Sequence, residues 1–167
     1  MKKQRRNFSL VCLLLLSLGV SSFSIAESRA IDEDFFKSIR LEAEQSSPNA
    51  QYNLGLLYYW MNYYENAREW FEKAAEQGLA QAQFSLGVMY DQGRGVPQND
   101  AKAFEWYEKA AQQGDVDAQL SLGVMYMIGQ GVAQNKATAK ELFKQACDNG
   151  DKTGCNNYRL LMNGLAE

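Results

Sequence analysis

The sequence predicts an all-α protein, an α-solenoid built from three helix-turn-helix repeats with a capping helix at each end. The main observation is an internal repeat, because residues 81–114 and 117–150 have nearly the same sequence, with equivalent residues 36 positions apart. A fixed period of this length that holds two helical patterns is typical of stacked repeat arrays. In addition, only two prolines occur in the 167 residues, so few helices are expected to be interrupted.

Three complete repeats are predicted, over residues 49–78, 79–114 and 115–150. In the first repeat we expect helix A over residues 50–60 and helix B over residues 64–77. The second and third repeats have a longer connection with two glycines, at 93 and 95 and at 129 and 131. Glycines supply the positive φ angles that a tight turn needs. No strand precedes these glycines and no third glycine follows, so a phosphate-binding loop is not supported.

The two ends of the array are predicted to be atypical. Residues 27–48 contain a short lead and a helix over residues 34–45, which we interpret as an N-terminal capping helix. Residues 151–167 match helix A of a further repeat, but Arg159 replaces the expected glycine and no helix B follows. We therefore expect a C-terminal capping helix.

Residues 1–26 have the pattern of a secretory signal peptide. Four basic residues precede an apolar run over residues 8–20, and Ser24 and Ala26 are small residues at the expected cleavage site. An uncleaved membrane anchor is the alternative, although the apolar run is short for a membrane span. The prediction is an exported protein, periplasmic or else secreted, with no membrane insertion after cleavage.

The charge of the remaining chain argues against two classes of partner. Four of the 17 basic residues and none of the 20 acidic residues lie in residues 1–26, so the rest carries 13 − 20 = −7. An acidic chain without a basic stripe disfavours nucleic acid and anionic lipid surfaces. The chain has no histidine, the most common metal ligand and general base at neutral pH. We expect no metal site and no cofactor.

Glycines in the middle of helix A indicate close helix packing. Gly87 and Gly123 occupy positions where glycine costs about 1 kcal/mol relative to alanine. We expect close approach of helix B, whose residues Ala103, Ala110 and Ala111 are also small. Larger side chains then fill the remaining space between the helices.

Two cysteines, Cys147 and Cys155, remain after removal of the predicted signal peptide. An even number of cysteines in an exported chain suggests one disulfide. The two residues are equivalent to Ala111 and Gln119, positions expected to face each other across the turn between antiparallel helices. A bridge would attach the closing helix with about 2–3 kcal/mol. A redox-active pair is the alternative, but the spacing is not C-x-x-C.

Three motifs resemble the Sel1-like repeat family, a relative of the tetratricopeptide repeats. They are A-Q-x-x-L-G-x-x-Y at 82–90 and 118–126, G-x-G-V at 93–96 and 129–132, and W-Y-E-K-A-A at 106–111. The resemblance covers about two-thirds of the chain. It implies a right-handed superhelix of helix pairs and a role as scaffold or adaptor. The cysteine spacing is similar to that of the cysteine-rich branch of the family, although this chain has a single pair.

The resemblance also predicts a binding surface, because such arrays bind partners along the concave wall lined by helix A. The predicted partner-binding residues are Tyr52, Leu56, Tyr59, Trp60, Phe84, Val88, Asp91, Gln92, Leu120, Val124, Met127 and Ile128. This set is mostly apolar and aromatic, which suits an extended or helical segment with apolar anchors. The alternative is that the residues inside the helices pack against neighbouring helices, while those at the helix ends are exposed.

The main competing hypothesis is enzymatic. Some cysteine-rich relatives are described as binding or hydrolysing penicillin-like compounds, and the resemblance implies that possibility here. The sequence has no S-x-x-K motif, no histidine for a zinc site or a triad, and no carboxylate pair placed in a shared apolar pocket. We therefore predict a protein- or peptide-binding scaffold without catalytic residues.

Overall fold

The computed structural model describes residues 37–41, 43–45 and 47–164. The predicted signal peptide and the first residues of the predicted leading helix lie outside this range. The chain forms two compact units, residues 1–41 and 42–167. In the first unit, residues 37–41 are helical. The second unit contains all three predicted repeats and the closing helix, and it is the part that carries the candidate site.

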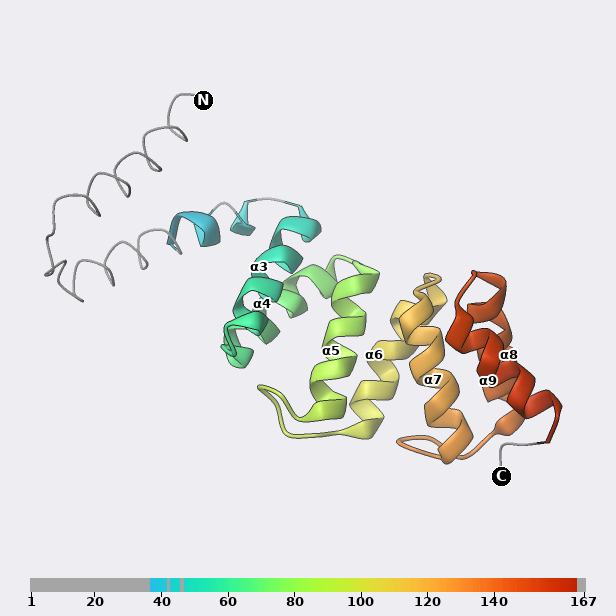
Figure 1. Ribbon diagram of the computed structural model, residues 1–167. Helices are drawn as coiled ribbons and strands as arrows, with labels where there is room; N and C mark the ends of the chain where they lie inside the picture. Colours follow the sequence, from blue (N-terminus) through green and yellow to red (C-terminus); the bar gives the residue numbers. More distant parts are fainter. Residues whose placement is uncertain (1–36, 42, 46, 165–167) are drawn as a thin grey trace, which may run out of the picture. The chain divides into compact units, whose positions relative to one another are not determined.

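Seven helices follow one another in residues 47–164 (Figure 1). They are α3 (Pro48–Trp60), α4 (Tyr64–Glu76), α5 (Ala80–Gln92), α6 (Asp100–Gln112), α7 (Val116–Ile128), α8 (Lys136–Asp148) and α9 (Lys152–Met162). No strand occurs in the described residues. The helices α3 and α4 begin and end within two residues of the predicted bounds. The prediction of an all-α solenoid is confirmed.

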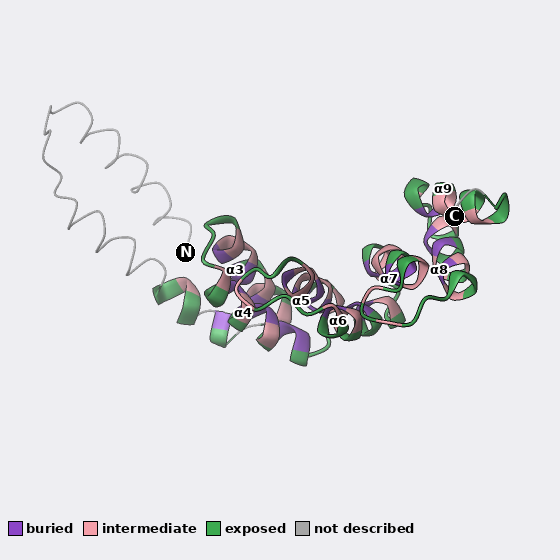
Figure 2. Ribbon diagram, turned by 90° about the horizontal axis from the view of Figure 1, so that it is seen from below, coloured by how far each residue is buried: buried purple, intermediate pink, exposed green. Residues whose placement is uncertain are grey.

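The helices of the second unit form two layers (Figure 2). The first helices of the pairs, α3, α5 and α7, lie in one layer, and the second helices, α4, α6 and α8, lie in the other. Each helix packs against the next one along the chain, and α9 packs against α8. We refer to the layer of α3, α5 and α7 as the inner layer and to the layer of α4, α6 and α8 as the outer layer.

The mid-helix glycines allow aromatic rings of helix B to approach helix A. A Cβ atom on Gly87 would lie 2.5 Å from the Tyr107 ring, and one on Gly123 would lie 2.5 Å from the Phe143 ring. The first repeat has the same arrangement, with Gly55 against Phe71. The predicted close approach of helix B is confirmed. The nearest atoms belong to large buried rings, which need more room than an alanine.

The glycine loops act both as turns and as contacts between repeats. Gly93 and Gly129 follow α5 and α7 with φ of 67° and 77°, so the predicted turn role is confirmed. A Cβ on Gly95 would lie 2.7 Å from the backbone of Tyr64, and one on Gly131 would lie 2.5 Å from the backbone of Asp100. Each loop therefore packs on the start of the outer helix in the preceding repeat.

The shorter connection in the first repeat makes its turn without glycine. Asn62 has a φ of 63°, in the left-handed region that asparagine tolerates better than most residues. Its side-chain oxygen accepts a 2.6 Å hydrogen bond from the Tyr64 hydroxyl. This local bond lies in the turn between α3 and α4, which is four residues shorter than the later loops.

Candidate partner-binding surface

The inner layer presents a row of partly exposed apolar side chains. None of the twelve predicted residues is fully buried: Trp60, Gln92, Val124 and Ile128 are exposed, and the other eight are half-buried. Among the large apolar side chains that the structure describes, Trp60 is the most accessible, at 75%. The predicted strip is thus accessible along α3, α5 and α7.

A small pocket of about 150 Å³ lies in this strip between the first two repeats. It is lined by three predicted residues, Tyr59, Phe84 and Val88, and by Phe71 and Ser85. Phe71 is 1% exposed and comes from the outer helix α4. Its ring lies 6.4 Å from that of Tyr59 and therefore forms the floor of the pocket. Sequence reasoning missed Phe71 because it considered helix A alone; Gly55 in the facing helix was the available signal.

Several predicted residues also contribute to packing inside their own repeat. The ring of Tyr52 lies 5.6 Å from that of Phe71, and the ring of Phe84 lies 5.5 Å from that of Tyr107. Both predicted residues thus contact a buried ring of helix B and are still half-buried rather than buried. For these two residues, packing and binding are therefore compatible roles.

Polar contacts surround the pocket and connect adjacent repeats. Arg94 donates a 2.6 Å hydrogen bond from Nη1 to the Tyr59 hydroxyl oxygen, and its guanidinium lies 5.6 Å from the Tyr59 ring. The same hydroxyl lies 3.5 Å from Oε1 of Gln92. Arg94 places a cation at the edge of an otherwise apolar pocket. It was not among the predicted residues, because it lies in the loop of the following repeat.

The predicted residue Asp91 is already bonded within the protein. Gln130 donates from Nε2 to Oδ1 of Asp91 over 2.9 Å and to Oδ1 of Asp100 over 3.2 Å. Gln130 occupies the same position in the third repeat as Arg94 in the second. This loop position therefore fastens each longer repeat to the one before it. Asp91 contributes to the junction between repeats two and three.

Three glutamines, at equivalent positions of the three repeats, are buried between helices. Gln83 donates to the Ala75 carbonyl oxygen over 3.2 Å and accepts a 2.6 Å bond from Gln113. Gln51 and Gln119 are buried in the same way. A buried amide is stable only when it is hydrogen-bonded, so these side chains fix the distance between successive helices. The recurring A-Q pair was the sequence signal.

The disulfide joins α8 to α9 at positions equivalent to those of the Gln83–Ala75 hydrogen bond. Cys147 in α8 and Cys155 in α9 form a bond, with their Cα atoms 4.4 Å apart. The equivalent residues two repeats earlier, Ala75 and Gln83, form the hydrogen bond just described. A Cβ on Gly154 would lie 2.7 Å from that of Ala146, so glycine allows α9 to approach α8. The predicted Cys147–Cys155 disulfide is confirmed.

The pKa shifts of two ionisable groups in this unit are explained by burial. Burial raises the pKa of Tyr107 and, in half-buried Asp115, raises the carboxyl pKa above its ordinary value of 3.8. Asp115 accepts a hydrogen bond from the Ala118 amide and so begins α7. Within the described part of the chain, no group of three or more Asp, Glu or Cys side chains could hold a metal ion. Nor is any described helix long and apolar enough to cross a membrane.

The motifs and the repeated helix pairs agree with a known family. The Sel1 repeat model matches residues 48–61, 62–79, 80–115 and 116–151, which is more than half of the chain. The chain belongs to the Sel1 repeat family. This confirms the resemblance noted in the motifs, and the matched residues include all of α3 to α8. Sel1 repeats form scaffolds for protein interactions.

Solved Sel1 repeat structures are similar in fold. A protective antigen of uropathogenic Escherichia coli with an SLR fold is 38% identical, with a TM-score of 0.72 over 78% of this chain and 29% of that chain. A Sel1 repeat protein from Oxalobacter formigenes is 34% identical, with a TM-score of 0.67 over 74% of this chain and 96% of that one. Cysteine rich protein B of Helicobacter pylori is 31% identical, with a TM-score of 0.52 over 54% and 68%.

One curated relative comes from a plant. The chain is 33% identical over 77 residues to HRD3A of Arabidopsis thaliana, a component of an ERAD-associated E3 ubiquitin-protein ligase. The match covers 43% of this chain and 11% of that protein, so the chain spans about a tenth of its length. The similarity is therefore limited to a small part of that protein.

Proposed function

We propose that this Sel1 repeat chain is a non-catalytic scaffold that binds a protein or peptide partner along its inner layer. The observation that supports the proposal most is the pocket formed by Tyr59, Phe84 and Val88 over the Phe71 ring. An exposed tryptophan, Trp60, lies at the end of the same helix as Tyr59. Exposed aromatic residues next to a preformed pocket are typical anchors in protein interfaces.

The chemistry of the surface defines the kind of partner. The inner strip carries few charges, and one of its carboxylates, Asp91, is bonded to Gln130. Arg94 places a cation beside Tyr59 at the edge of the pocket. A segment with an aliphatic or aromatic anchor fits the pocket, and a carboxylate or carbonyl oxygen beside that anchor could accept a hydrogen bond from Arg94.

The proposed location is the periplasm, which rests on the signal-peptide pattern of residues 1–26. Cell fractionation together with N-terminal sequencing of the mature protein tests this part. Recovery of the uncleaved chain from the membrane fraction would contradict it.

Site-specific photo-crosslinking tests the proposed binding face. A photoreactive amino acid at Val88 is expected to trap a partner from an envelope extract, whereas the same group at Glu69, exposed on α4, is expected to trap none. Trp60→Ala should reduce the Val88 crosslink without loss of helicity. Equal crosslinking from both positions would contradict the inner-layer proposal. A β-lactam turnover assay on the purified protein separates this function from the alternative of a penicillin-hydrolysing enzyme.

A further inference from the structure

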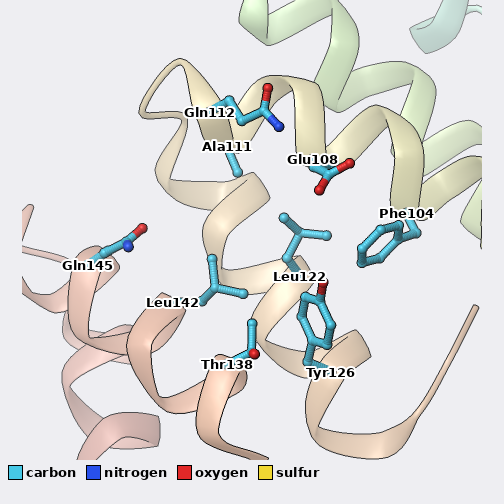
Figure 3. Close-up of a pocket in the computed structure, with 9 residues that line it drawn as sticks. All are labelled: Phe104, Glu108, Ala111, Gln112, Leu122, Tyr126, Thr138, Leu142 and Gln145. Carbon is cyan, nitrogen blue, oxygen red and sulfur yellow. The ribbon is translucent and has the colours of Figure 1, made fainter. Parts of the chain in front are cut away.

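A second pocket, of about 230 Å³, lies on the outer layer between α6 and α8. Its walls include Phe104 and Glu108 from α6 and Thr138 and Leu142 from α8, and Leu122 and Tyr126 from α7 lie at its base (Figure 3). We call this pocket the outer groove. It is on the layer opposite to the proposed inner binding face, and it does not depend on that proposal.

The preceding repeat has different side chains at the equivalent positions. Subtracting the 36-residue period from the six residues above gives Arg68, Glu72, Lys102, Trp106, Leu86 and Tyr90. The residues at the base are thus retained, as leucine and tyrosine, whereas the walls change from long cationic and aromatic side chains to shorter or apolar ones.

Cations cover the aromatic surface in the preceding repeat. The Arg68 guanidinium lies 2.7 Å from Oε1 of Glu72, and this bond raises the pKa of Arg68. Lys102 lies 5.2 Å from the centre of the Tyr90 ring, and Lys109 lies 3.9 Å from that of Trp106. At this junction the chain itself therefore supplies the Trp106 ring and two lysines stacked on aromatic rings. It also supplies Arg68 as the cation that pairs with Glu72.

The outer groove lacks the tryptophan, the two stacked cations and the cation that pairs with the carboxylate. Leu142 stands in place of Trp106, Thr138 in place of Lys102, and Phe104 in place of Arg68. Glu108 is retained and exposed, but the residue four positions before it is now Phe104, whose ring packs on Tyr126. Glu108 is in none of the salt bridges of the described residues. Figure 3 shows its carboxylate beside Phe104 and Leu122.

We propose that the outer groove binds a peptide segment of a partner protein that carries one large apolar side chain and a nearby lysine or arginine. The apolar side chain occupies the space above Leu122 and Tyr126, and the cation pairs with Glu108. The volume favours a single side chain over a small-molecule ligand, since ligand pockets usually measure about 300–1,000 Å³. The complementary charge gives the preference for a basic segment.

A defined peptide tests the proposal. The probe is a blocked alanine- and glutamine-based peptide with one tryptophan and, three residues later, one lysine. We expect amide NMR shifts to change most in α6, α7 and α8, with a Kd of about 0.1–1 mM. Glu108→Gln should weaken binding about two- to five-fold at low salt, as for an exposed ion pair. Glu105→Gln removes the same charge from the same helix outside the groove and should have no effect.

Filling the groove gives an independent test. Leu142→Trp restores the aromatic residue of the preceding repeat and should reduce peptide binding at least about ten-fold, a difference of about 1.4 kcal/mol. Circular dichroism checks that this variant is folded, and Glu108→Gln tests the proposal if it is not. Absence of binding, shift changes confined to α3 and α5, or equal binding of a peptide with glutamate in place of lysine would overturn the proposal.

Discussion

Replacement of Gly87 by alanine is expected to destabilise the protein, although glycine is a poor residue for a helix. An alanine Cβ would lie 2.5 Å from two ring carbons of Tyr107. Carbon atoms normally pack at about 3.5–4.0 Å, so the overlap is about 1 Å or more. Tyr107 is only 3% exposed, and its ring has little free space to move into.

Two opposing effects determine the magnitude. Overpacking a core costs about 1–3 kcal/mol, and an overlap of this size against a buried ring belongs at the upper end. Alanine gains about 1 kcal/mol over glycine inside a helix. We therefore expect Gly87→Ala to lower the free energy of unfolding by about 2 kcal/mol. For a protein of this size the melting temperature should fall by about 4–8 °C.

Urea denaturation followed by circular dichroism measures this change. Tyr107→Leu removes the ring, so in that background Gly87→Ala should raise the free energy of unfolding by up to about 1 kcal/mol. Tyr107→Phe keeps the ring and should keep the penalty. If Gly87→Ala stabilises the wild-type protein, or if the penalty persists with Tyr107→Leu, the ring contact does not explain the glycine.

Three further predictions concern the junctions between helices. Cys155→Ser should lower the free energy of unfolding by about 2–3 kcal/mol, because the disulfide holds the terminal helix α9. The effect should appear first as faster amide exchange in α9, and unchanged exchange would contradict this. Gln83→Leu removes the bonds between α5 and its neighbours and should cost about 1–3 kcal/mol by urea denaturation, whereas exposed Gln81→Leu should be neutral. The raised pKa of Asp115 means that the native state binds more protons than the unfolded state just above pH 3.8, so stability falls as pH rises through that interval. Asp115→Asn keeps a capping side chain and should gain stability relative to wild type at neutral pH but not below pH 3.8; a pH-independent difference would refute this.

Much of the fold could be predicted because its signals are local. The period of 36 residues gives the number of repeats, and Gly93 and Gly129 mark the ends of α5 and α7 through their left-handed conformation. The pairing of Cys147 with Cys155 follows from the short turn between antiparallel helices. Each of these inferences needs only residues close together in the chain or one period apart.

The candidate site was predictable only in part. The positions on helix A follow from helical spacing, so Tyr59, Phe84 and Val88 were found in advance. Phe71 and Arg94 were not, because Phe71 comes from helix B and Arg94 from the loop of the next repeat. Contacts between residues that are not neighbours on one helix depend on how the helices pack.

The sequence by itself determined the helix pairs, their order, the family and the disulfide, because these depend on periodicity and on turn chemistry. Only the tertiary structure decided which side chains fill the space between the helices and which remain available. Gly87 faces the ring of Tyr107, and Asp91 is bonded to Gln130. The outer groove likewise arises because Phe104, Thr138 and Leu142, from two different helices, are brought together above Leu122. The physical reason is that packing and hydrogen bonding act over a few ångströms in space, whatever the distance along the chain.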